Sequence, residues 1–255
     1  MLDPRQIDSF IRDGFVRLAG AVPHEIVGAC RSSVMDGLRG QGVDGDDPST
    51  WVEPVVRLVC TDVAFIAAGS QPMLSEAYDQ LIGAGTWWGQ QGVGGSVVVR
   101  FPHAADPGDA GWHIDGSYEV GDEYWVNVRS RGRGLLCLFL VSDVGPDDAP
   151  TELKVGSHLD VPPVLLPFGV RGAPFWRVSR RLPERTFERP SAFATGRAGD
   201  VIVCHPFLVH RATWPHRGTT PRIMAQPGVL RHEPFSLVGP EPWPVEQAIR
   251  QALVV

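Results

Sequence analysis

The beginning of the chain carries the apolar spacing of an amphipathic helix. Asp3 can cap a helix whose first residue is Pro4, and Gly14 ends it. The apolar stripe of this helix consists of Ile7, Phe10 and Ile11. We predict that a short strand, Phe15 to Leu18, follows directly.

Two further helices are predicted before residue 85. Pro23 opens the first of them, and its apolar residues recur at helical spacing: Ile26, Val27, Cys30, Val34 and Leu38. A polar loop rich in glycine and aspartate follows from Gly40 to Pro48. The second helix is predicted over Met73 to Leu81.

From Trp87 onward, short apolar and β-branched runs replace the helical pattern. Glycine, proline and aspartate interrupt these runs, which is typical of a β-sandwich or a jelly roll. The predicted strands are Ser96 to Phe101, Trp112 to Asp115, Tyr124 to Val128, Leu135 to Val141, Val201 to His205 and Arg222 to Gln226. We expect a mainly β protein whose N-terminal helices cover one sheet.

The chain contains no obvious linker and no internal repeat. We therefore predict one domain over residues 1–255, in which helices from 1–85 pack on a jelly-roll core from 86–235. The segment from Pro162 to Pro190 is long and rich in proline and arginine. A loop of that length in a compact domain is usually functional, and we predict that it forms a lid over the site.

Composition narrows the class of protein. Hydrophobic residues make up 43% of the chain, enough to bury a substantial core, and the net charge of −6 gives no support for nucleic-acid binding. The run Arg129 to Arg133 is a local basic cluster. We interpret it as a solvated loop between strands, with contact to an anionic substrate as the alternative.

The chain is expected to be cytoplasmic and not bound to a membrane. No stretch approaches the 18 or so uninterrupted apolar residues of a membrane span, and the N-terminus does not have the pattern of a signal peptide. The four scattered cysteines are predicted to be reduced core residues: Cys30, Cys60, Cys137 and Cys204.

Candidate metal ligands lie in two distant segments. His113 and Asp115 are two residues apart, so on an extended strand both side chains point to the same side. His210, 97 positions later, would complete a set of two nitrogens and one oxygen. Such a set on one face of an octahedral metal leaves three positions open, as in non-haem Fe(II) oxygenases. Arg222 follows 12 residues after His210 and suits the carboxylate of a cosubstrate.

The order of four segments resembles the phytanoyl-CoA dioxygenase family of Fe(II)- and 2-oxoglutarate-dependent oxygenases. These segments are Phe10 to Val16, Trp112 to Asp115, Pro150 to His158, and Ala198 to His205 leading to His210. The third resembles the family segment that ends in Pro-Gly-Ser-His, although Val155 replaces its proline. The asparagine that often follows the last histidine is absent, and Trp214-Pro215-His216 occupies that stretch.

The resemblance implies a double-stranded β-helix of the jelly-roll, cupin-like kind. It also implies that His113, Asp115 and His210 bind Fe(II), and that Arg222 binds the far carboxylate of 2-oxoglutarate. O₂ would be the oxidant, and a small organic substrate, such as one of secondary metabolism, would be hydroxylated or desaturated with release of succinate and CO₂. Related halogenases have glycine or alanine at the position of Asp115, so the carboxylate favours oxidation over halogenation.

Other residues are assigned to the site by their position. We predict that the Thr151 hydroxyl contacts the cosubstrate and that Trp125 and Arg100 contact the substrate. Arg222 is preferred to Arg211 and Arg217 for the carboxylate because it opens an apolar strand, which places a side chain more rigidly than a loop. The remaining histidines are interpreted as structural: His205 where a strand ends, His158 in a turn near the site, and His24, His103, His216 and His232 elsewhere.

Two other classes of function stay open. One is a cupin-like metalloenzyme that does not use 2-oxoglutarate, which would form no succinate. The other is a catalytically silent binding protein of the same fold. The sequence does not identify the substrate or the oligomeric state.

Overall fold

A seven-stranded antiparallel sheet forms the centre of the computed structural model, which describes residues 1–89 and 92–254. From one edge to the other, the strands are β1 (Phe15–Leu18), β10 (Val201–Cys204), β6 (Arg133–Leu140), β12 (Arg222–Ala225), β3 (Val97–Arg100) and β2 (Val55–Leu58), and β13 (Gly228–Leu230) pairs with β6.

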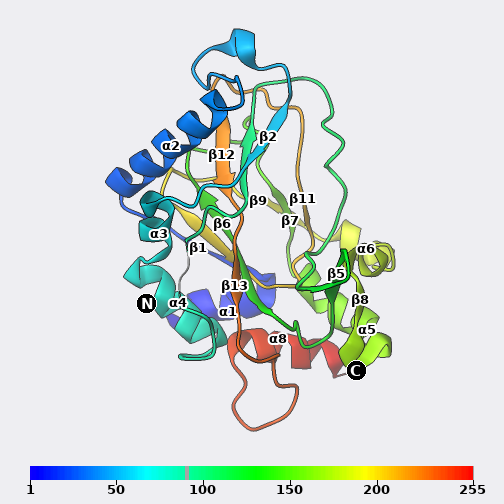
Figure 1. Ribbon diagram of the computed structural model, residues 1–255. Coiled ribbons are helices and arrows are strands. Elements are labelled where there is room, and N and C mark those ends of the chain that lie inside the picture. Colours follow the sequence, from blue (N-terminus) through cyan, green and yellow to red (C-terminus); the bar gives the residue numbers. More distant parts are fainter. Residues whose placement is uncertain (90–91, 255) are drawn as a thin grey trace.

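Two small antiparallel sheets complete the β structure. One contains β11 (His210–Arg211), β7 (Glu152–Lys154) and β9 (Ser191–Phe193). The other contains β4 (Tyr118–Val120), β5 (Glu123–Val126) and β8 (Ala173–Pro174). In Figure 1 the strands β7, β9 and β11 lie on the opposite side of the large sheet from the helices α2 and α3.

Helices lie along the large sheet and across one of its ends (Figure 1). Those before the sheet are α1 (Pro4–Asp13), α2 (His24–Arg39), α3 (Val63–Gly69) and α4 (Pro72–Ile82). Those later in the chain are α5 (Val161–Leu165), α6 (Phe175–Ser179), α7 (Glu184–Glu188) and α8 (Pro244–Leu253), with single 3₁₀ segments η1 (Pro48–Thr50), η2 (Ser157–Leu159) and η3 (Leu166–Arg171). The helix α8 packs against α1 and α4.

The predicted start and end of the first helix are confirmed. The Asp3 side chain accepts a hydrogen bond from the Gln6 backbone N–H, and the Gln6 side-chain oxygen accepts one from the Asp3 N–H, which makes a capping box. Gly14 ends the helix with a φ of 89°, a conformation that glycine adopts without strain. The predicted strand at residues 15–18 and the helices at residues 24–39 and 72–82 are also present.

The apolar run of β6 is continuous because both faces of the large sheet are buried. Leu135, Cys137 and Phe139 belong to the main core, which the helices complete. Leu136, Leu138 and Leu140 face the other way, into a second cluster with residues of β7, β10 and β12. The second cluster lies between the large sheet and the β11-β7-β9 sheet, and it forms the floor on which the site is built.

Two sequence predictions about segments are wrong. Residues 112–115 do not form a strand, because only His113 pairs with another backbone segment there. Residues 162–190 are not a loop, because they contain four short helical segments and β8. All of their prolines except Pro190 lie at or just before helix starts, where a missing N–H costs little. The sequence reading also missed α3, α8 and the edge strand β2.

The burial of the cysteines agrees with the sequence reading. All four cysteines are buried and none is joined to another. None of the helices in residues 1–89 and 92–254 combines the length and the apolar character that crossing a membrane would require.

Candidate metal centre

Three potential ligand side chains converge at one end of the space between the sheets. His113 and His210 exchange two backbone hydrogen bonds, of 3.0 and 2.9 Å, which bring segments 97 residues apart side by side. Their ring centroids are 4.4 Å apart, and Asp115 Oδ1 lies 3.8 Å from His210 Nε2. One ligand atom from each of the three residues lies within 4.8 Å of the others. This separation suits a single ion bound between them.

Backbone carbonyls fix the orientation of both imidazoles. His113 Nδ1 lies 2.8 Å from the Gly111 carbonyl oxygen, and His210 Nδ1 lies 3.0 Å from that of Leu208. A carbonyl oxygen only accepts hydrogen bonds, so each Nδ1 carries the proton and donates it. Each Nε2 therefore keeps a lone pair, which is the arrangement that metal-binding histidines show.

Burial and charge set the protonation states that a metal requires. Burial, with a smaller effect of the neighbouring His113, lowers the pKa of His210 to about 4, so the imidazole is neutral near pH 7. Burial opposes ionisation of Asp115, but Arg133 and the two histidines outweigh it and hold the pKa of this carboxyl below its usual range. Neutral imidazoles and an ionised carboxylate bind a divalent cation without first losing protons.

The prediction that the basic cluster is a solvated loop is wrong for Arg133. Its Nη1 donates to Asp115 Oδ2, and its side chain is only 19% exposed. Arg129 is half-buried and donates to the Phe235 carbonyl, so only Arg131 of the three arginines is exposed. The bond leaves Asp115 Oδ1 as the oxygen nearest His210. Arg133 therefore orients the carboxylate.

The position of Arg133 in the cavity could not be predicted from the sequence, because the register of β6 is irregular there. Strict alternation along β6 would place Arg133 on the same face as Leu135, in the helix-covered core. The pairing with β13 skips Gly134, since Val229 pairs with Leu135 and Leu230 pairs with Arg133. Such a bulge turns the side chain before Gly134 to the other face, so that Arg133 lines the cavity with Leu136.

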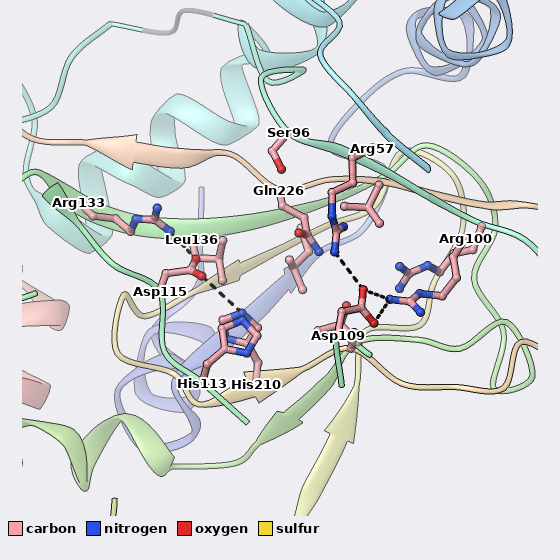
Figure 2. A pocket seen from close by; sticks show the side chains of 15 residues that line it. Arg57, Ser96, Arg100, Asp109, His113, Asp115, Arg133, Leu136, His210 and Gln226 are labelled. Atoms are coloured by element: carbon pink, nitrogen blue, oxygen red, sulfur yellow. Dashed lines mark hydrogen bonds and ion pairs between the residues drawn. The ribbon is translucent and has the colours of Figure 1, made fainter. Parts of the chain in front are cut away.

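A cavity of about 280 Å³ extends from the three ligands between the two sheets. Figure 2 shows His113, His210 and Asp115 at one end of it and Arg100 at the other, with Gln226 and Ser96 along the wall between them. A more open hollow of about 530 Å³ adjoins the same ligands on the outside, and Tyr124 and Phe175 line it. The site thus has an inner and an outer compartment.

Arg222, the first residue of β12, lines the inner cavity. It is 2% exposed, and its Nη1 donates to the Ala149 carbonyl over 3.0 Å. Its buried Nε has no partner among the described residues. Burial, together with the charge of Arg100 directly opposite on β3, lowers the pKa of Arg222 to about 9.

Two other predicted site residues line the same cavity. Thr151 is buried beside Arg222, and its hydroxyl lies 3.7 Å from the Met224 sulfur. Arg100 is 2% exposed and donates to both oxygens of Asp109, over 2.8 and 3.0 Å. The Asp109 carboxylate also accepts from Arg57 over 3.0 Å. Sequence reading named neither Arg57 nor Asp109.

Trp125, Arg211 and Arg217 lie elsewhere. Trp125 is absent from the residues that line the two compartments, whereas its neighbour Tyr124 lines the outer one. Arg211 pairs with Glu152 over 2.8 Å and stacks on the Trp112 ring. Arg217 is exposed. The strand β5 therefore presents Tyr124, and not Trp125, to the hollow.

The turn at residues 156–158 supports His210 without touching the cavity. The Ser157 hydroxyl accepts a hydrogen bond of 2.9 Å from the backbone N–H of Val209. The His158 ring turns away and donates to the Ile11 carbonyl of α1 over 3.0 Å. It stacks against His205, which is buried as well, with ring centroids 4.8 Å apart. Neither of these histidines lines the two compartments around the ligands.

Comparison with known proteins identifies the fold. No family model matches the chain, and no curated protein matches it. Among solved structures, HygX from Streptomyces hygroscopicus, with nickel, 2-oxoglutarate and hygromycin B bound, aligns over 92% of this chain and 90% of its own (15% identity, TM-score 0.57). EctD from S. alaskensis in its apoform aligns over 90% and 77% (18% identity, TM-score 0.56).

A third solved structure is similar over most of its length. It is the non-haem α-ketoglutarate-dependent carbocyclase SnoK from nogalamycin biosynthesis, which aligns over 90% of this chain and 84% of its own (15% identity, TM-score 0.53). At these identities the likeness shows a shared fold of mainly antiparallel sheets with flanking helices.

Proposed function

We propose that this chain is a non-haem Fe(II)- and 2-oxoglutarate-dependent oxidoreductase that hydroxylates or desaturates a small organic substrate. The observation that carries the proposal is the arrangement of one cavity. Two fixed Nε2 atoms and one carboxylate oxygen face its outer end, and a buried arginine with an unpartnered Nε lies within it. Two similar structures, HygX and SnoK, are described with 2-oxoglutarate bound or as α-ketoglutarate-dependent.

The residues fit an Fe(II) ion and 2-oxoglutarate. His113, Asp115 and His210 would hold the metal, and the two nitrogen and one oxygen donors suit Fe(II). When bound, the iron and its cosubstrate supply O₂ activation coupled to oxidative decarboxylation, which yields succinate and CO₂. Arg133 keeps the Asp115 carboxylate in one orientation and in its ionised form. Leu136 and Leu138 give the inner cavity an apolar floor beneath these polar groups.

Arg222 would bind the far carboxylate of 2-oxoglutarate. A buried guanidinium without a counter-ion is costly, and a carboxylate accepts two of its donors at once. The Thr151 hydroxyl lies on the same wall and would donate to that carboxylate. This need for an anion argues against a metalloenzyme that does not use 2-oxoglutarate, and against a binding protein that kept only the fold.

Fold and reaction outcome are extensions of the same proposal. We propose that the large sheet and the β11-β7-β9 sheet form the double-stranded β-helix of the phytanoyl-CoA dioxygenase family. We also propose that the whole chain is one domain. Asp115 supplies a carboxylate where related halogenases have glycine or alanine, so oxidation without halogen transfer is the proposed outcome.

Succinate formation tests this proposal. The protein is incubated with Fe(II), 2-oxoglutarate, ascorbate and air, and succinate is measured by mass spectrometry. We expect succinate with the wild-type protein and none above background with His210→Ala. Equal succinate from both proteins would trace it to a contaminant and remove the support for this activity.

A further inference from the structure

The boundary between the inner cavity and the outer hollow is lined by arginine. Five residues belong to both compartments: Arg57, Asp109, His113, Asp115 and Arg133. Figure 2 shows Arg57 pointing from its strand into the space beside Asp109, while Arg133 reaches Asp115 from the other side. A molecule that approaches the metal ligands from outside therefore passes between two guanidinium groups.

The charges around this boundary do not balance. Four arginines line the two compartments, namely Arg57, Arg100, Arg133 and Arg222, but only Asp109 and Asp115 face them. The site thus carries an excess of two positive charges in a chain whose net charge is −6. A divalent metal together with dianionic 2-oxoglutarate adds no net charge. The excess is therefore still present when both are bound.

One of the two excess charges lies beside Asp109. Asp115 neutralises Arg133, and in the proposed function the cosubstrate neutralises Arg222. Arg57 and Arg100 then share one carboxylate, that of Asp109. Arg100 is almost completely buried, whereas the Arg57 side chain is 59% exposed. Of this pair, Arg57 is the arginine that an incoming molecule can reach.

Arg57 also has donors to spare. Within the described residues, its only side-chain hydrogen bond runs from Nη2 to Asp109, and its Nε and Nη1 have no protein partner. Asp109 fixes the guanidinium at the boundary, so its remaining donors are held in place for a ligand. Nη2 carries two N–H groups and lies between Nε and Nη1, so one edge of the guanidinium, Nη2 with either Nε or Nη1, stays open and matches two oxygens of a carboxylate or a phosphate.

We propose that the substrate of this enzyme carries an oxyanion, a carboxylate or a phosphate, which Arg57 binds at the boundary between the two compartments. The inference rests on the proposed function for the identity of the reacting centre. The anionic group binds Arg57 on the outer side of His113 and Asp115, and the body of the substrate lies in the hollow against Tyr124 and Phe175. Arg57 is then a specificity-determining residue.

The opposite edge of the same sheet provides a matched control. Arg17 is the third residue of edge strand β1, as Arg57 is of edge strand β2, and both strands end in Val-Arg-Leu. The Arg17 side chain is 51% exposed and pairs with Asp200 over 3.1 Å. Arg17 does not line either compartment. A structural role for a strand arginine would therefore appear in Arg17→Gln as much as in Arg57→Gln.

The test uses three probes of one size: benzoate, phenyl phosphate and uncharged benzamide. Each is titrated by calorimetry into the anaerobic full chain loaded with Fe(II) and 2-oxoglutarate, while the visible band of the iron chelate is recorded. We expect an anionic probe to bind at least about tenfold more tightly than benzamide, because a charge-assisted hydrogen bond is lost with the charge. The preferred anion distinguishes a carboxylate from a phosphate.

The variants decide where the anion binds. Arg57→Gln should weaken binding of the anionic probe by about tenfold or more, and Arg57→Lys should weaken it by less. Arg17→Gln should bind the probe as the wild type does. The inference fails if benzamide binds as tightly as the anions, if no anion binds the wild type at millimolar concentration, or if Arg57→Gln binds unchanged. It also fails if the probe bleaches the band, because the anion then displaces the cosubstrate.

Failure of the proposed function would be seen separately. A wild-type protein that forms no chelate band does not bind 2-oxoglutarate on iron, whatever the probes do. Calorimetry on that protein still reports whether an anion binds at Arg57.

Discussion

Arg222 is a buried guanidinium that would be stabilised by an anionic ligand. Its guanidinium is 2% exposed, and Ala149 and Arg100 are its nearest described neighbours by hydrogen bond and by charge. Removing one partner of a buried charged pair costs about 2–5 kcal/mol, so we expect Arg222→Ala to weaken 2-oxoglutarate binding about thirtyfold or more. Calorimetry in the presence of Fe(II) measures this. Arg217→Ala is the control, since Arg217 is exposed. A large effect in Arg217→Ala alone would show that Arg217, and not Arg222, binds the far carboxylate.

In the proposed site, Arg133 acts on the metal through its ion pair with Asp115. A hydrogen-bond partner that orients a metal ligand typically changes metal affinity by about 10–100-fold when it is lost. We therefore expect Arg133→Gln to weaken Fe(II) binding by about tenfold or more while the protein stays folded. Arg131→Gln, two residues earlier on the exposed side, should bind Fe(II) as the wild type does. Equal Fe(II) affinity in Arg133→Gln and the wild type would show that the ion pair has no positioning role.

The ligand residues could be proposed from the sequence, whereas their supporting residues could not. His113, Asp115 and His210 stand in a recognisable order along the chain, and the structure brings them together. Arg133 reaches Asp115 only because the bulge at Gly134 turns it. Arg57 and Asp109 meet across 52 residues of sequence with no local pattern to indicate the pairing. Long-range polar contacts of this kind depend on the register of several strands at once.

At the scale of elements, the packing of α1 and α8 encloses two histidines. His158 and His205 stack between the Ile11 carbonyl of α1 and the Val245 carbonyl of α8. A Cβ atom at Gly14 would lie 2.5 Å from His158 Nδ1, so the space is filled. Burial lowers the pKa of His158 to about 4 and lowers that of His205 as well. Both rings are therefore neutral in the folded protein near pH 7.

This burial makes stability depend on pH. Between about pH 6.5 and pH 4 the unfolded chain binds a proton at residue 158 that the folded chain does not, so stability falls as the pH falls through that window. The contribution of His158 to the loss is about 3 kcal/mol. Urea unfolding of metal-free protein at pH 7 and pH 4.5 should show a smaller loss for His158→Gln than for the wild type. The exposed His24→Gln should behave as the wild type, and an unchanged loss in His158→Gln would contradict the assignment.

Helices and strands could be predicted where capping residues or an apolar run within the element itself specify it. The capping residues of α1 and the apolar runs of β6 and β10 specify their own structure, and these elements are present. Residues 162–190 have short helices of five or six residues, which tertiary contacts stabilise and periodicity does not reveal. The segment at residues 112–115 is extended enough to pair once, with His210, but it is too irregular for a strand.

At the scale of the whole molecule, the large sheet has the main hydrophobic core on one face and the cavity with the candidate ligands on the other. One face packs against the helices and forms the main core. The other face, with the β11-β7-β9 sheet, encloses the cavity, so the metal ligands and the arginines stand on rigid strands or directly beside them. In the proposed function, the cosubstrate binds in the inner compartment and the substrate in the outer hollow. Binding from different sides would then let the cosubstrate bind first.

Anaerobic titration with Fe(II) and 2-oxoglutarate tests the central claim most directly. The chelate of 2-oxoglutarate on such an iron has a weak visible charge-transfer band, which requires the metal site and the cosubstrate site together. We predict that the wild-type chain develops this band at one iron per chain, and that His113→Ala, Asp115→Ala and His210→Ala, which remain folded, do not. Absence of the band in the wild type, or full Fe(II) affinity by calorimetry in any of the three variants, would contradict the account.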